Sequence, residues 1–394
     1  MKQMRTQVGI VGAGPAGLML GHLLHLEGID SIIVENRSKE HVIERVRAGV
    51  LEHGSVQQLV DAGVGDRLLR EGMRHRGVWL CFDNRRHRVD FEALTGGRTI
   101  TVYGQNEVVK DLIGARAASG RPLYFEADRV TIADVDTERP RMHGRIDGRD
   151  EAIACDFVAG CDGFHGISRA SLRPADYVTF ERTYPFGWLG ILAQAAPSSD
   201  ELVYALHSRG FALFSMRSST VTRLYVQSAA DEPLEPWTDE RIWDELEARF
   251  ACEDGWSPTR GPILQKGITG MRSFVLEPMR FGRLFLAGDA AHIVPPTGAK
   301  GLNLALSDVR VLARAIAAYY HAARTDLLDR YSEQCLERVW AAQRFACWMT
   351  AMLHRAPDDT AFDHRRQIAE LNHVIRSPAA ATSFAESYVG PALD

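Results

Sequence analysis

A short polar set in the middle of the chain has the composition of a binding site for a small anion. Ser215 and Arg217 stand two positions apart in an apolar run, so on a strand their side chains share one face. Tyr225 lies in the next apolar run, which is expected to form a neighbouring strand. A guanidinium with two hydroxyls suits a carboxylate, because charge-assisted hydrogen bonds are stronger than neutral ones. The set predicts a carboxylate site, with an ordinary surface arginine as the alternative for Arg217.

A glycine pattern near the start of the chain indicates a second kind of chemistry. The apolar run that begins at Val8 leads into Gly12, Gly14 and Gly17, spaced as Gly-x-Gly-x-x-Gly. In a strand–turn–helix unit, such glycines permit a tight turn, a close approach to a pyrophosphate and close helix packing. Glu35 follows Gly17 by roughly 20 residues, where this fold places an acid on a ribose. The pattern predicts a dinucleotide site, and an ordinary strand–helix turn is the alternative.

The elements that must position these residues indicate a mixed α/β fold. Residues 1–178 are predicted to form a Rossmann-like nucleotide-binding domain, interrupted near 76–98 by a β-hairpin that joins the next domain. Residues 179–271 are predicted to form an inserted β-sheet domain that carries the carboxylate site. Residues 272–394 contain a last buried strand and then a helical C-terminal region. Within the first domain, residues 122–160 are expected to form an antiparallel meander.

Composition narrows the class of protein. The 394 residues carry a net charge of −5 and no long basic run, which argues against a nucleic-acid partner. None of the six cysteines is spaced as Cys-x-x-Cys, so neither a metal site nor a redox pair is indicated. The uncharged stretch 6–26 contains five glycines and a proline, so we expect strand, turn and helix rather than a membrane span. A cytoplasmic protein that does not bind membranes is expected.

Three strand-end turns, at 12–17, 161–163 and 288–303, occur in the order found in the single-component flavoprotein hydroxylases, and the chain resembles that family. Longer motifs are similar to those of members that hydroxylate 4-hydroxybenzoate, and the similarity covers essentially the whole chain. These motifs lie at 45–52, 160–169, 184–190, 295–303 and 388–390. The resemblance implies an FAD-dependent monooxygenase that converts 4-hydroxybenzoate to 3,4-dihydroxybenzoate (protocatechuate) with NAD(P)H and O2, through a flavin hydroperoxide.

The resemblance also implies the residues that hold FAD. The glycine loop and Glu35 match the contacts to the ADP half. Asp162 matches a residue that serves FAD and the nicotinamide coenzyme, and Asp289 matches one that holds the ribityl and pyrophosphate part. Arg223 is implied to bias the flavin between a position near the substrate and one near the coenzyme. Further positions that match FAD contacts are Arg45, Arg47, Gln105, Thr297, Gly298, Leu302 and Asn303.

On the substrate side, the carboxylate set matches the family's ligands for the substrate carboxylate. Tyr204 and Tyr388 match the pair that contacts the 4-hydroxyl and helps to ionise it, with two packed core tyrosines as the alternative. His75 matches the solvent end of that proton chain, a role that suits a group titrating near neutral pH, with a structural histidine as the alternative. Pro296 is implied to offer its backbone carbonyl to the ring hydroxyl.

The nicotinamide coenzyme has no Rossmann unit of its own, because only one Gly-x-Gly-x-x-Gly is present. The family uses a surface cleft instead, and His165 and Arg272 match its pyrophosphate contacts. Members that prefer NADPH tend to carry an arginine and an aromatic residue where this chain has Asn36 and His41. Arg37 stands nearby, but neighbouring glutamates offset its attraction for a 2′-phosphate. NADH is therefore expected to be preferred.

Several alternatives stay open at this point. The same chemistry on a close para-substituted benzoate, such as 4-aminobenzoate or 3,4-dihydroxybenzoate, is one. A flavin oxidase or dehydrogenase is another, and a non-catalytic nucleotide-binding module is a third. The family forms homodimers through its C-terminal region, so an apolar stripe over 340–353 is interpreted mainly as core and in part as interface.

Overall fold

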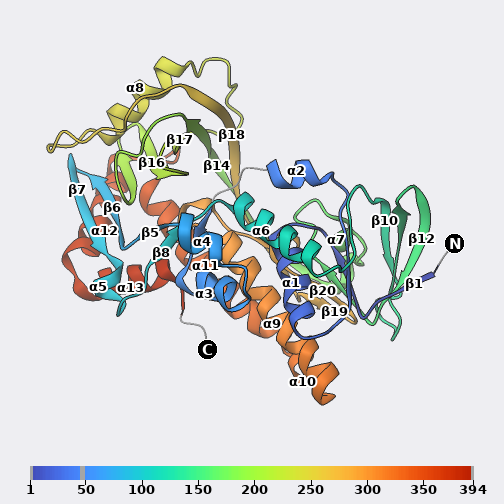
Figure 1. Cartoon of the computed structure of the whole chain (residues 1–394). Helices are drawn as coiled ribbons and strands as arrows, with labels where there is room; N and C mark the ends of the chain where they lie inside the picture. Colours follow the sequence, from blue (N-terminus) through green and yellow to red (C-terminus); the bar gives the residue numbers. More distant parts are fainter. Residues whose placement is uncertain (1–2, 45–48, 392–394) are drawn as a thin grey trace.

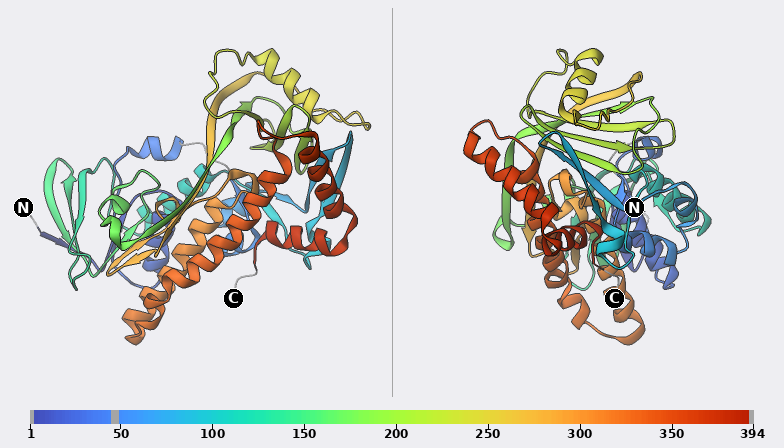
Figure 2. Two further views of the ribbon diagram at one scale, coloured as in Figure 1. Left: turned by 180° about the vertical axis from the view of Figure 1, so that it is seen from behind. Right: turned by 90° about the vertical axis from the view of Figure 1, so that its left-hand side faces the viewer.

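The computed structural model describes residues 3–44 and 49–391 (Figure 1). The molecule is elongated. A lobe that carries the strands β10 and β12 lies at one end, and a lobe that carries the helix α8 lies at the other. The long helices α9 (Gly301–Ala322) and α11 (Tyr331–Leu353) pack on each other between the lobes, as the view from behind in Figure 2 also shows. The α/β class predicted from the sequence is confirmed.

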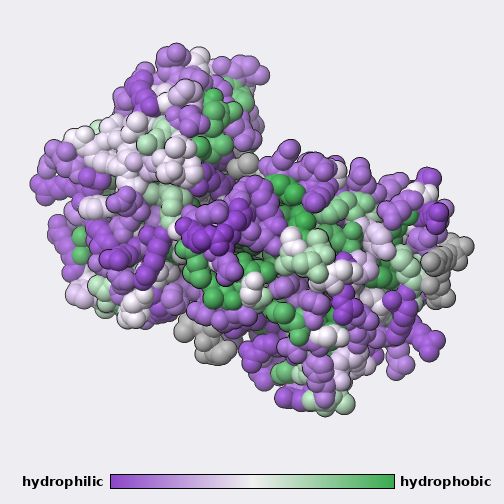
Figure 3. Space-filling view, viewed as in Figure 1, coloured by the Kyte–Doolittle hydropathy of each residue, from purple (hydrophilic) through white to green (hydrophobic). Residues whose placement is uncertain are grey.

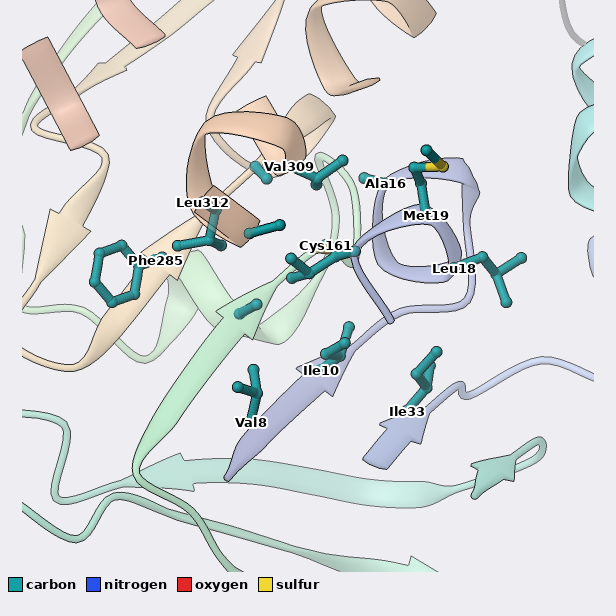
Figure 4. Close-up of a cluster of buried hydrophobic side chains, with 14 of the residues drawn as sticks. Val8, Ile10, Ala16, Leu18, Met19, Ile33, Cys161, Phe285, Val309 and Leu312 are labelled. Atoms are coloured by element: carbon teal, nitrogen blue, oxygen red, sulfur yellow. The ribbon is translucent and has the colours of Figure 1, made fainter. Parts of the chain in front are cut away.

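A six-stranded sheet forms the core of the first lobe. Its strand order is β19-β20-β13-β2-β3-β9, and all its pairings are parallel except that of β19 with β20. Apolar side chains from α1 (Pro15–Leu26) and α9 cover the sheet, among them Leu18, Val309 and Leu312 (Figure 4). The strands are β2 (Val8–Val11), β3 (Ser31–Val34), β9 (Leu123–Tyr124), β13 (Phe157–Gly160), β19 (Arg280–Phe281) and β20 (Leu284–Leu286).

An eight-stranded sheet forms the second lobe, in the order β21-β18-β14-β17-β16-β15-β6-β7. The hairpin β6–β7 joins it through parallel pairing of β6 with β15. One face is covered by α8 (Asp239–Phe250), and the other packs against α11, α12 (Ala361–Arg376) and α13 (Pro378–Val389). The strands are β6 (Gly77–Phe82), β7 (Arg85–Asp90), β14 (Val178–Ala193), β15 (Leu202–His207), β16 (Gly210–Met216), β17 (Thr222–Ala229), β18 (Ile263–Glu277) and β21 (His292–Ile293).

The predicted meander is shorter than expected. Only β10 (Asp128–Ala133), β11 (Arg141–Ile146) and β12 (Arg149–Ala154) form antiparallel neighbours, and β1 (Gln3–Arg5) adds to β12 in parallel. The outer parts of the expected meander, β9 and β13, belong instead to the parallel sheet. The reason is visible in β13, which is buried along its whole length, as strands covered on both faces are.

Smaller elements close the space between the lobes. A three-stranded sheet, β4 (Val50–Leu51), β8 (Ile100–Val102) and β5 (Met73–His75), lies beside α3 (His53–Asp61) and α6 (Gln105–Ala118). Figure 3, which shows the same side of the molecule as Figure 1, has hydrophilic residues over most of the surface and hydrophobic residues gathered near its middle. Within the described part of the chain, no helix combines the length and apolar character that a membrane crossing requires.

Candidate active site

The turns after β2, β13 and β20 meet at one edge of the parallel sheet, because these strands are neighbours in it. Gly12 has a φ of +104°, and a Cβ built there would lie 2.4 Å from the carbonyl oxygen of Cys161. A Cβ on Gly288 would touch Ala305 and Ala16. The three loops singled out in the sequence therefore pack directly against one another, and glycine is required where the backbones approach.

The first turn of α1 offers hydrogen-bond donors at this edge. No side chain caps the helix at Gly14, and a Cβ there would meet nothing within 4 Å. Uncapped N–H groups at a helix N-terminus attract phosphate. The carboxylate of Glu35 accepts hydrogen bonds from the N–H groups of Ala13 (2.8 Å) and Arg37 (2.9 Å), and it retains further acceptor capacity for a ribose hydroxyl. This open cradle of donors and one acid fits the ADP half of a dinucleotide.

The second loop uses its aspartate internally. One carboxylate oxygen of Asp162 accepts from the backbone N–H of Ser168 at 2.8 Å and from its hydroxyl at 3.0 Å. These bonds hold the short helix α7 (Ile167–Ala170) against the loop. Burial raises the pKa of Asp162. Asp162 therefore holds the 161–163 loop in place, independently of the ligand that binds beside the loop.

The Gly288 turn is fixed by a buried pair that the sequence reading missed. The carboxylate of Asp308 accepts from the backbone N–H of Gly288 at 2.9 Å and lies 2.7 Å from Nε2 of His292. Burial works against a charged imidazole, but Asp308 more than offsets it and raises the pKa of His292. The neighbouring Asp289 stays exposed at the loop edge. No motif marks this pair, because its members lie on different elements.

The start of α9 provides a second uncapped helix N-terminus. Leu302 and Asn303 lie in its first turn, where backbone N–H groups have no partner within the helix. The side chain of Asn303 is fully engaged: it accepts from Glu52 N–H (2.8 Å) and donates to the carbonyls of Val50 (3.0 Å) and Ala299 (2.8 Å). Asn303 thus ties β4 to α9 through its side chain and leaves its backbone to a ligand.

A pocket of about 430 Å³, including the space at its mouth, lies between the eight-stranded sheet and these loops. Six residues singled out in the sequence line it together, although they are spread over four elements. Its lining is Gly49, Val50, Val102, Trp188, Leu202, Tyr204, Leu213, Ser215, Met216, Arg217, Arg223, Tyr225, Pro296 and Ala299.

Strand register explains this convergence. Tyr204 pairs with Leu213, and Leu213 pairs with Tyr225, so one row of β15, β16 and β17 carries both tyrosines. Ser215 lies two positions beyond Leu213 on the same face and is paired with Arg223. The backbones of Tyr204 and Tyr225 are two strand spacings apart, roughly 10 Å. The hydroxyl-bearing Tyr204 therefore lies at one end of the pocket wall, and Ser215 and Tyr225 lie at the other.

Two glycines make room for the guanidinium groups of the pocket. A Cβ on Gly104 would lie 3.0 Å from a terminal nitrogen of Arg217, and one on Gly190 would lie 2.9 Å from a terminal nitrogen of Arg223. Gln105 begins α6 immediately after Gly104. Burial lowers the pKa of Arg217 from its ordinary value. A half-buried guanidinium of this kind bonds an anionic partner more strongly than a neutral one.

At the other side of the pocket, the hydroxyls of Tyr204 and Tyr388 are in hydrogen-bond contact, and Tyr204 donates to the carbonyl of Thr297 at 3.2 Å. Thr297 is held in turn by a 2.9 Å hydrogen bond between its hydroxyl and that of Thr350. Both tyrosines are buried, and burial raises the pKa of each. They are neutral hydroxyls that can accept one proton while donating another.

The structure does not place His75 at the solvent end of a chain. The residue is fully buried on β5, and its Nδ1 accepts the backbone N–H of Leu202 at 3.3 Å. Burial lowers its pKa to about 4, against an opposing effect of Glu201. A buried ring of this kind fits the structural alternative, and the assignment of His75 to the solvent end of the proton chain stays a prediction. Its Nε2 has no hydrogen-bond partner among the described residues.

The residues expected on the coenzyme side are at the surface. His165 and Arg272 are exposed and lie on two sides of the Phe164 ring, whose centre is 5.0 Å from the imidazole centre and 4.9 Å from the guanidinium carbon. Asn36 and Arg37 lie just before α2 (Lys39–Glu44), which has no buried residue and includes His41. Arg45 and Arg47 lie outside the described residues.

The sequence did not predict that Trp188 lines the pocket or that His354 supports it. The indole of Trp188 donates to Nε2 of His354 at 2.7 Å, and its ring lies 4.7 Å from that of Tyr225. Nδ1 of His354 bonds the carbonyl of Thr350 at 3.0 Å, so the ring is held at both nitrogens. Burial lowers the pKa of His354 to about 3.

Among the described residues, no group of three or more His, Cys, Asp or Glu side chains could hold a metal ion.

An open cradle that fits the ADP half of a dinucleotide occurs in the same molecule as a pocket lined by an arginine and a bonded tyrosine, an arrangement that fits an oxidoreductase with a dinucleotide cofactor. A family described as "FAD binding domain" matches residues 5–346. The chain belongs to the FAD-dependent aromatic monooxygenases of this family.

Named relatives make the similarity more specific. The chain is 49% identical over 390 residues to p-hydroxybenzoate hydroxylase of Acinetobacter baylyi, covering 99% of this chain and 96% of that protein. It is 26% identical to 3-(3-hydroxy-phenyl)propionate/3-hydroxycinnamic acid hydroxylase of Mycobacterium sp. (strain JLS), over 83% of this chain and 56% of that one. The fold is shared with p-nitrophenol 4-monooxygenase from Pseudomonas putida DLL-E4, at a TM-score of 0.83, 18% identity and full coverage of both chains.

Proposed function

We propose that this protein hydroxylates 4-hydroxybenzoate at the ring carbon beside the phenol, giving 3,4-dihydroxybenzoate, with NAD(P)H and O2 as co-substrates. One observation carries the proposal. A single pocket is lined at one place by the half-buried guanidinium of Arg217 with hydroxyl neighbours, and at another by Tyr204, whose hydroxyl contacts that of the buried Tyr388 outside the lining. The relative that is 49% identical is a p-hydroxybenzoate hydroxylase, which supports the same substrate here.

At the carboxylate end, Arg217, Ser215 and Tyr225 orient the substrate. Arg217 gives two parallel N–H donors to a carboxylate, and the two hydroxyls add further donors. The charge makes this end specific, because the N–H groups of a guanidinium bond a carboxylate more strongly than they bond a neutral acceptor. This end therefore sets which ring position faces the reacting centre.

At the phenol end, the substrate's proton moves to Tyr204, Tyr204 gives its own hydroxyl proton to Tyr388, and Tyr388 releases one to solvent, so that both tyrosines stay neutral. Because both tyrosines are neutral, the transfer is a concerted shift of hydroxyl protons rather than the ionisation of a tyrosine. The phenolate that results carries more electron density at the adjacent ring carbon. The backbone carbonyl of Pro296, which lines the same pocket, accepts from a ring hydroxyl and holds the ring against rotation.

FAD supplies the electron transfer and oxygen activation when bound. The residues that would hold it are the α1 N-terminus with Gly12, Gly14 and Glu35, the Asp289 turn, and the backbone of Leu302 and Asn303. Thr297, Gly298 and Gln105 complete the set, as the resemblance implies. Asp162 keeps the second loop in place, and Arg223, which lines the pocket, biases the flavin between two positions.

We further propose a surface site for the nicotinamide coenzyme at His165 and Arg272, with NADH preferred, and a homodimer built partly on the C-terminal helices. The division of the chain into an FAD domain (1–178), a substrate domain (179–271) and a C-terminal region (272–394) belongs to the same proposal. The hairpin β6–β7 in the substrate sheet and the helical end of the chain support it.

The deciding experiment compares several para-substituted benzoates. The purified yellow holoprotein is mixed with NADH and air, and NADH consumption is followed before and after each acid is added. We expect strong stimulation by 4-hydroxybenzoate with one equivalent of 3,4-dihydroxybenzoate formed per NADH. Faster and better coupled turnover of 4-aminobenzoate would favour that substrate instead. Flavin reduction by an amine or alcohol without NAD(P)H would identify an oxidase or dehydrogenase.

A further inference from the structure

Two cysteines outside the pocket meet where the second lobe's hairpin contacts the segment that follows α8. Cys81 lies on β6 and is only 3% exposed, whereas Cys252 is half-buried. Both belong to the apolar cluster beneath α8, and the two thiols lie close enough for each to shift the pKa of the other. No step of the proposed hydroxylation uses either thiol.

Polar contacts hold the two segments in this arrangement. The backbone N–H of Glu253 donates to the carbonyl of Asn84, in the turn of the β6–β7 hairpin, at 2.7 Å. The next residue, Asp254, forms an ion pair with Arg86 of β7 at 2.6 Å. The contact between the cysteines is therefore fixed by the backbone and by charge on both sides, and it does not depend on the thiols alone.

Arg86 also places a positive charge beside the pair. Strand pairing sets Arg86 directly opposite Cys81, and its guanidinium lies 4.9 Å from the ring centre of Trp79 and 5.0 Å from that of Trp256. The two indoles hold the guanidinium in place. A cation next to a partly accessible thiol is the usual setting of a reactive cysteine.

The two thiols differ in the way that a reactive pair requires. The hydrogen bond from Cys81 lowers the pKa of Cys252, against burial and with the help of Arg86. The same hydrogen bond, together with burial, raises the pKa of Cys81. The half-buried Cys252 is the accessible thiol of the two and lies beside the cation of Arg86, so it is the one placed to attack an oxidant.

We propose that Cys252 and Cys81 form a peroxide-sensitive dithiol that closes to a disulfide. The co-reactant is hydrogen peroxide. The Cys252 thiolate attacks one peroxide oxygen, the O–O bond breaks, and hydroxide leaves, so that Cys252 becomes a sulfenic acid. The Cys81 sulfur then attacks the sulfenic sulfur and the S–O bond breaks. Water leaves with the remaining proton, and in sum two thiols are oxidised while one peroxide is reduced to two waters.

The disulfide would link β6 to the chain after α8. β6 pairs with β15, where Ala205 is opposite Cys81 and its neighbour Tyr204 lines the pocket. In the oxidised protein, the disulfide therefore lies opposite Ala205, the residue next to Tyr204 of the pocket lining. The inference goes beyond the proposed hydroxylation, and added peroxide tests it without substrate or NAD(P)H.

The experiment uses FAD-loaded protein that is first reduced, desalted and then treated with one equivalent of hydrogen peroxide. Remaining thiols are blocked with N-ethylmaleimide in denaturant, and peptides are mapped without reductant. We expect a linked Cys81–Cys252 peptide, loss of two hydrogens from the intact mass, and reversal by dithiothreitol. Cys252→Ser is expected to lose the linkage. Cys347→Ser is the matched control, because Cys347 is another half-buried thiol, and it is expected to keep the linkage.

A second variant separates the two steps. Cys81→Ser removes the resolving thiol, so Cys252 should accumulate as sulfenic acid and be captured by dimedone in higher yield than in the parent protein. If Cys81→Ser fails to fold, the parent and Cys252→Ser still decide the matter. Absence of the linked peptide in the parent, or oxidation of Cys347 as fast as Cys252, would overturn the proposal.

Discussion

The hydroxyl of Tyr204 touches the hydroxyl of Tyr388 inside the pocket wall, although 184 residues separate them in the chain. Tyr204 comes from the middle of β15, and Tyr388 comes from the last turn of α13. Only the packing of the C-terminal helices on the eight-stranded sheet brings them together. In the proposed mechanism, this contact is the buried route by which the substrate's proton leaves the pocket.

Removing the first hydroxyl of this route is expected to uncouple the reaction. In Tyr204→Phe, flavin reduction by NAD(P)H should continue, but hydroxylated product per NAD(P)H should fall and hydrogen peroxide should replace it, because the phenol is no longer ionised. Tyr184→Phe is the control, since Tyr184 is also buried and bonds Cys347 outside the pocket lining. Product and peroxide are measured together, and full coupling in Tyr204→Phe would remove this residue from the proton route.

Truncating the pocket arginine is expected to act on the substrate rather than on FAD. Arg217→Ala should weaken 4-hydroxybenzoate binding by at least about 1.5–3 kcal/mol, the usual contribution of a hydrogen bond to a charged group. FAD retention should change little. Arg173→Ala, at an exposed position with an ion pair to Asp176, serves as the control. If titration of the flavin spectrum gives a dissociation constant within about twofold of the parent, under ~0.5 kcal/mol, the carboxylate assignment is contradicted.

Two buried histidines are expected to make stability depend on pH. Burial lowers the pKa of His75 to about 4 and that of His354 to about 3, whereas the unfolded chain has a histidine pKa near 6.5. Below pH 6.5 the unfolded state binds a proton at each site that the native state does not bind. The free energy of unfolding therefore falls as pH falls, by up to about 1.4 kcal/mol per pH unit for each histidine.

Urea unfolding of the holoprotein at pH 7 and pH 5 measures this effect. His354→Gln should lose less stability than the parent between these values, because glutamine does not titrate. The exposed His373→Gln provides the comparison and should behave like the parent. Equal pH dependence in His354→Gln and the parent would show that His354 is not a neutral group that must stay unprotonated in the native state.

Local patterns in the sequence were enough to predict the nucleotide-binding edge of the parallel sheet. The glycine loop, its strand and its helix are contiguous, so their geometry follows from φ requirements and from the order of elements. Ser215 and Arg217 were placed on one face by period alone. The residues missed lie on other elements: His292 and Asp308 brace the Gly288 turn from two segments, and no short spacing announces that contact.

Burial was harder to predict than adjacency. His75 was expected at the solvent end of a proton chain, yet its imidazole is fully buried and accepts the backbone N–H of Leu202. The predicted meander, residues 122–160, included too many strands for a related reason. Apolar runs such as β13 read the same whether they join an antiparallel or a parallel sheet, and tertiary packing decides between the two.

The C-terminal stripe predicts a dimer contact of limited extent. Phe345, Met349 and Leu353 are buried within the chain, whereas Trp340 is 41% exposed and lies 5.4 Å from the ring of Phe180, which is 45% exposed. We expect sedimentation at micromolar concentration to show a dimer that Trp340→Ser weakens. A single 43.8 kDa species in the parent would contradict the dimer.

Coenzyme choice depends on the segment between β3 and α2. Arg37 is exposed, and its backbone N–H is held by Glu35 at 2.9 Å, so its position next to the dinucleotide loop is fixed. Glu40 and Glu44, both exposed, lie on the helix that follows. A 2′-phosphate brings roughly two negative charges and needs unopposed cations or a bidentate arginine. NADH lacks this group and loses nothing to the glutamates.

We therefore expect a higher kcat/KM with NADH than with NADPH at low salt, where charges are least screened. Arg37→Ala should lower kcat/KM for NADPH several-fold and leave that for NADH within about twofold, because only the phosphate has a use for the guanidinium. Glu40→Gln should act in the opposite direction and improve NADPH alone. Asn36→Arg adds a cation beside Arg37 and should raise kcat/KM for NADPH further. A parent enzyme roughly tenfold more efficient with NADPH, about 1.4 kcal/mol of discrimination, would show that Arg37 reads the phosphate despite its acidic neighbours.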